Sequence, residues 1–184
     1  MAVPEFGGVI DVELLPADAA DVPAVVGTVV DVVNLAYTTA EVELWRRPLP
    51  RTNQDEVRAA ITDGETAVAT LHGVIVGSLF VRLLDPDTGW FGALGVDPAV
   101  GGRGIGGRLV AFAEQRARAA GASEMQIEVL LPATYVAHSA RLIDWYTALG
   151  YREVESRGLA EFDPSSVDDA LVDIRVAVMR RPLA

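Results

Sequence analysis

The chain has no cysteine and no lysine among its 184 residues, and all 15 of its basic residues are arginine. The absence of cysteine excludes disulfides, thiolate metal sites and an acyl-cysteine intermediate, and it favours a cytoplasmic protein. The absence of lysine excludes a P-loop, whose lysine contacts the bound phosphates. There are two histidines but no H-E-x-x-H arrangement, and no G-x-S-x-G turn, so neither a zinc site nor a serine hydrolase is expected.

Positive charge is scarce, because 26 acidic residues give the chain a formal net charge of −11. Nucleic-acid binding is therefore not expected, since phosphate backbones require basic surfaces. The same charge repels a phosphate-rich ligand at long range. Such a ligand would have to be held by local backbone amides and by nearby arginines such as Arg103 and Arg108. A cationic co-substrate would be attracted.

The sequence shows no targeting or membrane segment. Its first residues, MAVPEFGGVIDVE, lack the positive region and the long apolar core of a signal peptide. The valine-rich run at 22–33 contains Asp31 and is too short to span a bilayer. No repeat or linker divides the chain, and a composition that is 51% hydrophobic supports a compact core. We therefore expect one cytoplasmic domain over residues 1–184, without a membrane partner.

Glycine is concentrated in the stretch from Leu94 to Gly107, LGVDPAVGGRGIGG, which has five glycines in its last seven residues. An apolar segment precedes this loop, and a helical pattern from about Ile105 to Ala120 follows it. Glycines leave backbone amides uncovered, and a helix start adds unpaired amides and the positive end of the helix dipole. The stretch therefore predicts an anion site suited to a phosphate or pyrophosphate.

A dinucleotide-binding fingerprint is one interpretation of this loop. Gly102, Gly104 and Gly107 satisfy G-x-G-x-x-G, and Glu128 lies about where a ribose-binding acid is expected. However, residues 97–101 separate the strand from the first glycine, and the parallel repeats of such a domain are absent. This interpretation is therefore the weaker one.

Hydrophobic periodicity predicts an α/β fold of the α+β kind, built on one mixed sheet. The first strands of this sheet are expected to be antiparallel, and the later strands to be joined through helices. Asp18 or Asp21 is expected to cap the first helix, with Pro23 in its first turn. Gly95 inside an apolar strand predicts a bulge or a close backbone approach. The expected strands are 9–15, 65–71, 74–83, 88–96, 124–131, 151–155 and 172–179; the expected helices are 22–37, 53–62, 105–120 and 138–149, with a polar loop at 162–169.

Two blocks of sequence carry a family resemblance. The first is Leu94-Gly95-Val96, an Asp97-Pro98 turn, and Gly101-Gly102-Arg103-Gly104-Ile105-Gly106 at the start of a long helix. The second, DWYTALGY at 144–151, is similar to an LYEKLGF pattern. Together they resemble the signature of the GCN5-related N-acetyltransferases (GNAT), over about residues 9–183. Gly101 stands where that family usually has arginine or glutamine, and Ser139 stands where it usually has asparagine.

The resemblance implies a largely antiparallel central sheet with two splayed central strands, flanked by about four helices. It implies acetyl-CoA as co-substrate, with the pantetheine arm paired along one strand and the pyrophosphate held by the glycine loop. A homodimer is one assembly that such a domain could form. The implied CoA-binding residues are Leu94, Val96, Gly101, Gly102, Arg103, Gly104, Ile105, Gly106, Gly107 and Ser139.

Direct transfer of an acyl group to an amine poses two proton problems. A lysine-like amine has a pKa near ~10.4 and is mostly ammonium at pH 7, so a base must accept a proton. The leaving thiolate gains from a proton donor, and the resemblance implies Tyr146 as this acid. Tyr146 also belongs to an apolar helical stripe, so a core role is its alternative. The base stays open between Glu128, His138, a water relay and a backbone carbonyl.

By resemblance, the acceptor side is formed by residues 37–51 and 156–169. Tyr37, Glu41 and Trp45 in the first segment suit a cationic amine, although arginines in both segments leave an anionic acceptor open. The expected function is transfer of an acetyl or short acyl group to a primary amine of a small molecule or peptide. A non-catalytic acyl-CoA-binding module is the alternative, and a dinucleotide-binding oxidoreductase ranks third.

Overall fold

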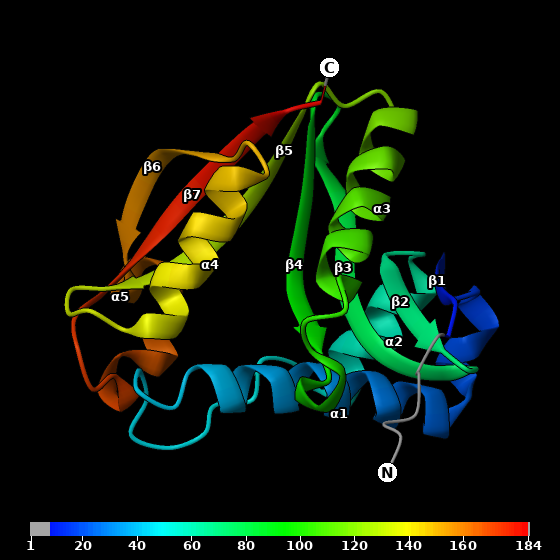
Figure 1. Cartoon of the computed structure of the whole chain (residues 1–184), viewed down its shortest axis with the longest axis horizontal. Helices are drawn as coiled ribbons and strands as arrows, with labels where there is room; N and C mark the ends of the chain where they lie inside the picture. Colours follow the sequence, from blue (N-terminus) through cyan, green and yellow to red (C-terminus); the bar gives the residue numbers. More distant parts are fainter. Residues whose placement is uncertain (1–7, 184) are drawn as a thin grey trace, which may run out of the picture.

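The computed structural model describes residues 8–183, which form one seven-stranded sheet in the order β1-β2-β3-β4-β5-β7-β6 (Figure 1). Neighbouring strands are antiparallel except β4 and β5, which are parallel. This confirms the predicted mixed, largely antiparallel sheet. The strands are β1 (Ile10–Leu14), β2 (Thr66–Leu71), β3 (Val74–Asp85), β4 (Thr88–Val96), β5 (Glu124–Pro132), β6 (Arg152–Gly158) and β7 (Ile174–Pro182); the helices are α1 (Pro23–Ala40), α2 (Gln54–Thr62), α3 (Ile105–Ala119), α4 (Ala137–Ala148) and α5 (Leu159–Phe162), with 3-10 turns η1 (Ala17–Asp21), η2 (Pro98–Val100) and η3 (Pro164–Asp169).

Helices cover both faces of the sheet because successive side chains of a strand point to opposite faces. On β2, Ala67 and Ala69 pack in the cluster that contains the buried residues of α3. Val68, between them, packs instead in the cluster of α1 and α2. In Figure 1, α3 lies over β3 and β4, α4 lies over β5 and β7, and α1 runs along the lower end of the sheet.

The start of α1 differs from the sequence prediction. Neither Asp18 nor Asp21 caps it: the N-cap residue is Val22, which makes no side-chain capping bond, and both aspartates lie in η1. η1 forms because Ala19 and Ala20 are buried against α2 and α1, which leaves no capping position for an aspartate. By contrast, α2 begins where the sequence places it, at Thr52 or Asn53, and Asn53 caps it, since its side chain accepts hydrogen bonds from the first-turn amides.

By length and composition, α1 could cross a membrane, since it has 18 residues with a mean hydropathy of 1.2. It extends past the run at 22–33 that we judged too short for a bilayer. Its packing supplies another reason for the apolar composition, because Val26, Val29 and Val33 are completely buried and the helix contacts β3 and β4.

The central strands β4 and β5 separate after a short parallel ladder. They pair only from Thr88 to Trp90 on β4 and from Glu124 to Gln126 on β5. Below this point the strands diverge, β4 running straight and β5 running away from it, as Figure 1 shows. We call this opening the fork. It matches the splayed central strands that the family resemblance implies.

A bulge in β4 lies inside the fork. The ladder with β3 shifts register between Gly92 and Gly95, and Ala93 has a φ of 50°. Gly95, which we predicted at a bulge or a close approach, occupies the close approach: a Cβ there would lie 2.8 Å from the Cα of Val33 on α1. α1 therefore packs directly on the β4 backbone at the fork.

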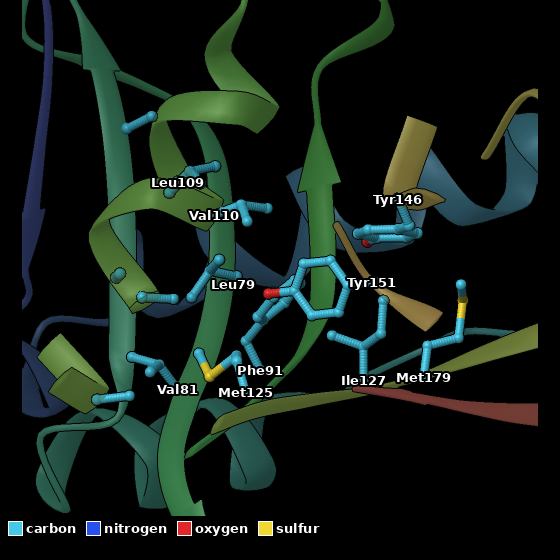
Figure 2. Packing of buried hydrophobic residues seen from close by; sticks show 14 of the residues in the cluster. Leu79, Val81, Phe91, Leu109, Val110, Met125, Ile127, Tyr146, Tyr151 and Met179 are labelled. Atoms are coloured by element: carbon cyan, nitrogen blue, oxygen red, sulfur yellow. The ribbon is translucent and has the colours of Figure 1, made fainter. Parts of the chain in front are cut away.

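Aromatic rings from β4, from α4 and from the turn after α4 meet in the main core, as Figure 2 shows for Phe91, Tyr146 and Tyr151. The hydroxyl of Tyr151 donates a hydrogen bond of 2.9 Å to Glu114 of α3. Arg181 donates to both oxygens of the same carboxylate, at 2.7 and 2.8 Å. Burial, and then the charge of Glu114, raises the pKa of Tyr151. The phenol oxygen of Tyr151 and both carboxylate oxygens of Glu114 are paired, and we assign this group to stability.

Candidate active site

The glycine loop ends at the start of α3. Gly104 is the N-cap residue of this helix with a φ of 75°, and Gly102 has a φ of 77°, so both occupy the left-handed region that favours glycine. No side chain of the described residues caps α3, so its first-turn amides can donate to a ligand. A side chain at Gly102, Gly104 or Gly107 would point into open space. The loop therefore has the exposed backbone that an anion site needs.

Of the two arginines considered for this loop, Arg108 is already engaged. Its Nη1 donates a hydrogen bond of 3.0 Å to the carbonyl of Ile10 on β1. Arg141 of α4 was not considered from the sequence, yet it lines the cavity beside the loop. This residue is a second cation on the side of the site where a phosphate-rich ligand would lie.

A first cavity, of about 560 Å³, lies between the end of β4, the end of α1 and the start of α4. The predicted CoA-binding residues Leu94, Val96 and Ser139 line it. Ser139 is only 6% exposed, so a residue much larger than serine would fill part of this space. Beyond Trp90, no described residue pairs with the β5-facing edge of β4, which leaves that edge open to an extended ligand.

A second cavity, of about 270 Å³, lies inside the fork and is lined by β4, β5, α2 and α5 as well as α1 and α4. The two cavities meet, since six residues line both: Tyr37, Glu41, Leu94, Leu130, Leu142 and Tyr146. A ligand in each cavity could therefore touch the other ligand at this junction.

Tyr146 lies at the junction and belongs to the core as well. It is 5% exposed, and its ring centroid lies 4.8 Å from that of Trp145 and 5.7 Å from that of Tyr151. Burial, and to a smaller degree the nearby Tyr37, raises the pKa of Tyr146. The phenol therefore keeps its proton at neutral pH. Burial in the same cavity would also disfavour the anionic form of a thiol. The pKa of the proton donor, the phenol, and the pKa of the proton acceptor, the thiolate, are therefore raised together.

Glu128, one of the two candidate bases, lines the second cavity. Its Oε2 accepts a hydrogen bond of 2.5 Å from Trp90 Nε1, and its Oε1 accepts one of 3.0 Å from Gln126 Nε2. Gln126 is oriented in turn by Arg180, whose Nε donates to its Oε1 at 2.9 Å. These bonds bridge β4 and β5 where the parallel ladder ends, so they hold the carboxylate in the fork.

Trp90 can reach Glu128 because Gly92 has no side chain. A Cβ at Gly92 would lie 2.3 Å from Cζ2 of the indole. The guanidinium of Arg82 lies 4.6 Å from the ring centroid of Trp90, and Arg82 also pairs with Glu65 at 3.7 Å. The indole is therefore held by contacts on either side.

His138, the other candidate base, lines the first cavity and is absent from the second. Burial, and then the charge of Arg141, lowers its pKa, while Glu41 acts weakly in the opposite direction. The imidazole is therefore neutral at pH 7. The structure thus separates the two candidates: Glu128 lies on one side of the junction and His138 on the other.

The predicted acceptor residues form one connected group. Glu41 is 9% exposed, and both of its oxygens accept hydrogen bonds of 2.8 Å from Arg51 Nη2. Arg51 lies 4.4 Å above the ring of Tyr37, whose pKa is raised by burial, an effect that Arg51 opposes. Trp45 donates to Glu41 Oε2 at 2.8 Å, but its side chain is buried in a separate cluster and lines neither cavity. Trp45 therefore positions Glu41.

The two segments expected to form the acceptor side lie together. Trp45 forms a bridge with Ala170, and Arg47 Nη2 lies 2.7 Å from an oxygen of Asp169. The segment at 162–169 is not the loop that the sequence predicted, because it contains the end of α5 and η3. These segments hold Phe162 at the second cavity.

Arg51 and Phe162 of the second cavity lie in the segments expected on the acceptor side, where Arg51 was considered as a possible anion ligand. Glu56, Phe80 and Trp90 line the same cavity and were not identified from the sequence. Trp90 and Phe80 resemble ordinary strand residues, and Glu56 falls in the first turn of α2, where an acid is typical of helix capping.

Comparisons with known proteins agree with this geometry. The sequence profile described as the acetyltransferase (GNAT) family matches residues 31–151. No curated protein matches the sequence. Among solved structures, the PaiA N-acetyltransferase from Thermoplasma acidophilum in complex with coenzyme A superposes with a TM-score of 0.70 at 11% identity, over 95% of this chain and 99% of that one.

Two further structures have the same fold. The IAA acetyltransferase from Bacillus cereus has a TM-score of 0.65 at 16% identity, covering 95% of this chain and 99% of its own. The ribosomal-protein-S18-alanine N-acetyltransferase from Escherichia coli has a TM-score of 0.61 at 16% identity, covering 96% and 95%. At these identities the likeness establishes the fold, and the profile match establishes the family. The chain belongs to the GNAT acetyltransferase family.

Proposed function

We propose that the protein transfers an acetyl or short acyl group from acyl-CoA directly to a primary amine. The observation that carries this proposal is the meeting of two cavities at Tyr146, one beside the glycine loop and one inside the fork. A reaction between two bound substrates needs such a junction, because it holds the reacting atoms together. The coenzyme A in the PaiA structure supports acyl-CoA as the donor.

Acyl-CoA would occupy the first cavity. The first-turn amides of α3 and the left-handed glycines Gly102 and Gly104 suit its pyrophosphate. The open edge of β4 at Leu94 and Val96 suits the pantetheine arm, which would pair there as a strand does. Ser139 lies on the opposite wall of the same cavity. The thioester would then lie at the junction, next to Tyr146.

The acceptor would enter the second cavity as an ammonium ion and lose one proton before it attacks. Glu128 is the base that this arrangement favours, because it lines the acceptor cavity and His138 does not. The amine nitrogen forms a bond to the carbonyl carbon, and the carbon–sulfur bond breaks. The departing thiolate takes the proton of Tyr146, and the second proton that the nitrogen loses as the amide forms returns to the phenolate through solvent, while the proton held by Glu128 is released. The products are the N-acyl amine, CoA and one released proton.

The test is thiol release from acetyl-CoA in the presence of a panel of primary amines, with the acylated product identified by mass spectrometry. We expect release that requires both the protein and an amine. Tight CoA binding by calorimetry with no release for any amine would contradict the proposal. That result would favour the alternative, an acyl-CoA-binding module, to which the departures at Gly101 and Ser139 also point.

A further inference from the structure

The second cavity has an unusual combination of walls for a space of about 270 Å³. At roughly 30 Å³ per water molecule, this volume corresponds to about nine waters, so it suits a short chain rather than a large ring system. Aromatic side chains from five different elements line it: Tyr37, Phe80, Trp90, Phe91, Tyr146 and Phe162. Such walls favour both methylene groups and cations.

The charges in this cavity do not cancel. Its charged residues are Glu41, Arg51, Glu56 and Glu128. Arg51 is paired with Glu41, since its Nη2 lies 2.8 Å from both carboxylate oxygens of that residue. Two carboxylates, Glu56 and Glu128, are then left without a cation among the described residues.

These two carboxylates come from different walls and accept hydrogen bonds only from neutral groups. Glu128, on β5, accepts from Trp90 and Gln126, at 2.5 and 3.0 Å. Glu56, on α2, accepts from Thr52 Oγ1 at 3.1 Å. Neutral donors orient a carboxylate without removing its charge, so each can still pair with a cationic group.

We propose that the acceptor is a linear aliphatic diamine, with one ammonium at Glu128 and the other at Glu56. This inference rests on the proposed acyl transfer, and it names the class of amine that the same cavity takes. The nitrogen at Glu128 reacts, since Glu128 is the base that the proposed acyl transfer assigns to this cavity. The methylene groups between the nitrogens lie against the aromatic walls, and the distal ammonium pairs with Glu56.

The same charges select against amines that carry a carboxylate. An amino-acid acceptor would bring its carboxylate beside Glu56 or Glu128, and Arg51 is already paired with Glu41. Leaving an anion without a partner in a partly buried cavity is costly. The geometry therefore separates linear diamines from amino acids as acceptors.

The test compares 1,4-diaminobutane with 1-aminobutane, in which a methyl group replaces the distal ammonium. We expect kcat/KM to be about fivefold higher for the diamine, the upper end of what an exposed ion pair contributes. In Glu56→Gln this ratio should fall close to one. Asp55→Asn is the matched control: it removes the same charge from the same helical turn, but Asp55 lies outside the cavity, so the ratio should remain as in the unmodified protein.

A binding measurement keeps this inference separate from the proposed function. Calorimetric titration of the CoA-loaded protein with 1,4-diaminobutane should show binding that Glu56→Gln weakens about fivefold and Asp55→Asn does not. Binding of this kind without thiol release would overturn the acyl transfer and leave the diamine site standing. Thiol release at equal rates for both amines, unchanged in Glu56→Gln, would overturn the diamine site and leave the acyl transfer standing. A preference for amino acids would also overturn it.

Discussion

The two cavities that meet at Tyr146 are built from different parts of the chain. On the donor side, the backbone groups expected to hold CoA, which are those of the glycine loop, the first turn of α3 and the open edge of β4, lie in one continuous stretch from Leu94 to Gly107, and side chains of α1 and α4 complete the first cavity beside it. The second depends on side chains, which come from α1, α2, three strands, α4 and α5. The donor side therefore tolerates many side-chain changes, whereas the acceptor side changes with each of them.

This difference suits a family that keeps one donor and varies the acceptor. Backbone amides and an open strand edge recognise groups that every CoA thioester shares. The carboxylates and rings in the fork can be exchanged one at a time without moving β4. Four predictions test the contrast, beginning with the residue that both cavities share.

Tyr146→Phe should have the largest effect, because the hydroxyl serves the junction of both cavities. We expect kcat to fall by about 10²-fold, the usual scale for loss of a general acid, with little change in acyl-CoA affinity. The ring contacts with Trp145 and Tyr151 are retained in phenylalanine, so the thermal unfolding midpoint should change little. Parallel losses of activity and stability would instead mark Tyr146 as a core residue only.

Gly104→Val should affect the donor side alone. Its φ of 75° is strained for a β-branched residue, so the backbone would have to shift at the point where α3 begins. We expect CoA affinity to fall at least about tenfold, equivalent to about 1.4 kcal/mol. Gly106→Val, in the first turn of α3, should weaken CoA binding in the same direction, because a Cβ there would lie 3.6 Å from Trp145 and 4.0 Å from Val96, which lines the first cavity.

Backbone strain itself needs a control, which Gly64 provides. Gly64 has a φ of 69° and open space around it, and it lies outside both cavities. Gly64→Val should therefore destabilise the fold to a similar degree without changing CoA affinity. Calorimetry on folded Gly104→Val that gives unchanged affinity would show that the amides of the loop do not hold CoA.

The sequence predicts most of the fold because its signals are local. The strand at Thr88–Val96 and the helix beginning at Ile105 were predicted at their observed bounds, since glycine, proline and apolar periodicity mark them. The start of α1 was predicted wrongly because burial of Ala19 and Ala20 decides it, and burial is not a local property. The splay of the two central strands followed from the family resemblance, not from periodicity.

The candidate site divides in the same way. The glycine loop could be read from seven residues, whereas the bond between Trp90 and Glu128 joins residues 38 positions apart. Nothing local to Trp90 indicates a role beyond strand packing. Arg51 looked like a possible anion ligand, and only the structure shows that Glu41 pairs with it. Contacts between distant segments decide which charges remain available.

Trp90→Phe should affect the acceptor side alone, and less strongly. The variant removes the Nε1 donor to Glu128 but keeps an aromatic ring beside Arg82. We expect kcat/KM for the amine to fall about fivefold, equivalent to the ~1 kcal/mol of a typical hydrogen bond, with an unchanged KM for acyl-CoA. A change confined to acyl-CoA would show that the indole serves the donor side and that Glu128 does not depend on it.

Salt should have the smallest effect, and it should act on the two sides with different signs. The net charge of −11 attracts a cationic amine and repels CoA at long range, so screening weakens the first interaction and relieves the second. Between ~0.05 M and ~0.5 M salt, we expect kcat/KM for the amine to fall by about two- to threefold. Over the same range, CoA affinity should hold or rise, because backbone amides rather than a basic surface bind its phosphates.

The comparison uses steady-state kinetics for the amine and calorimetry for CoA in the same buffers. If CoA affinity instead falls with salt as steeply as kcat/KM for the amine, arginines such as Arg141 hold the phosphates. Side chains would then build the donor side as well as the acceptor side, and the contrast between the two would be lost.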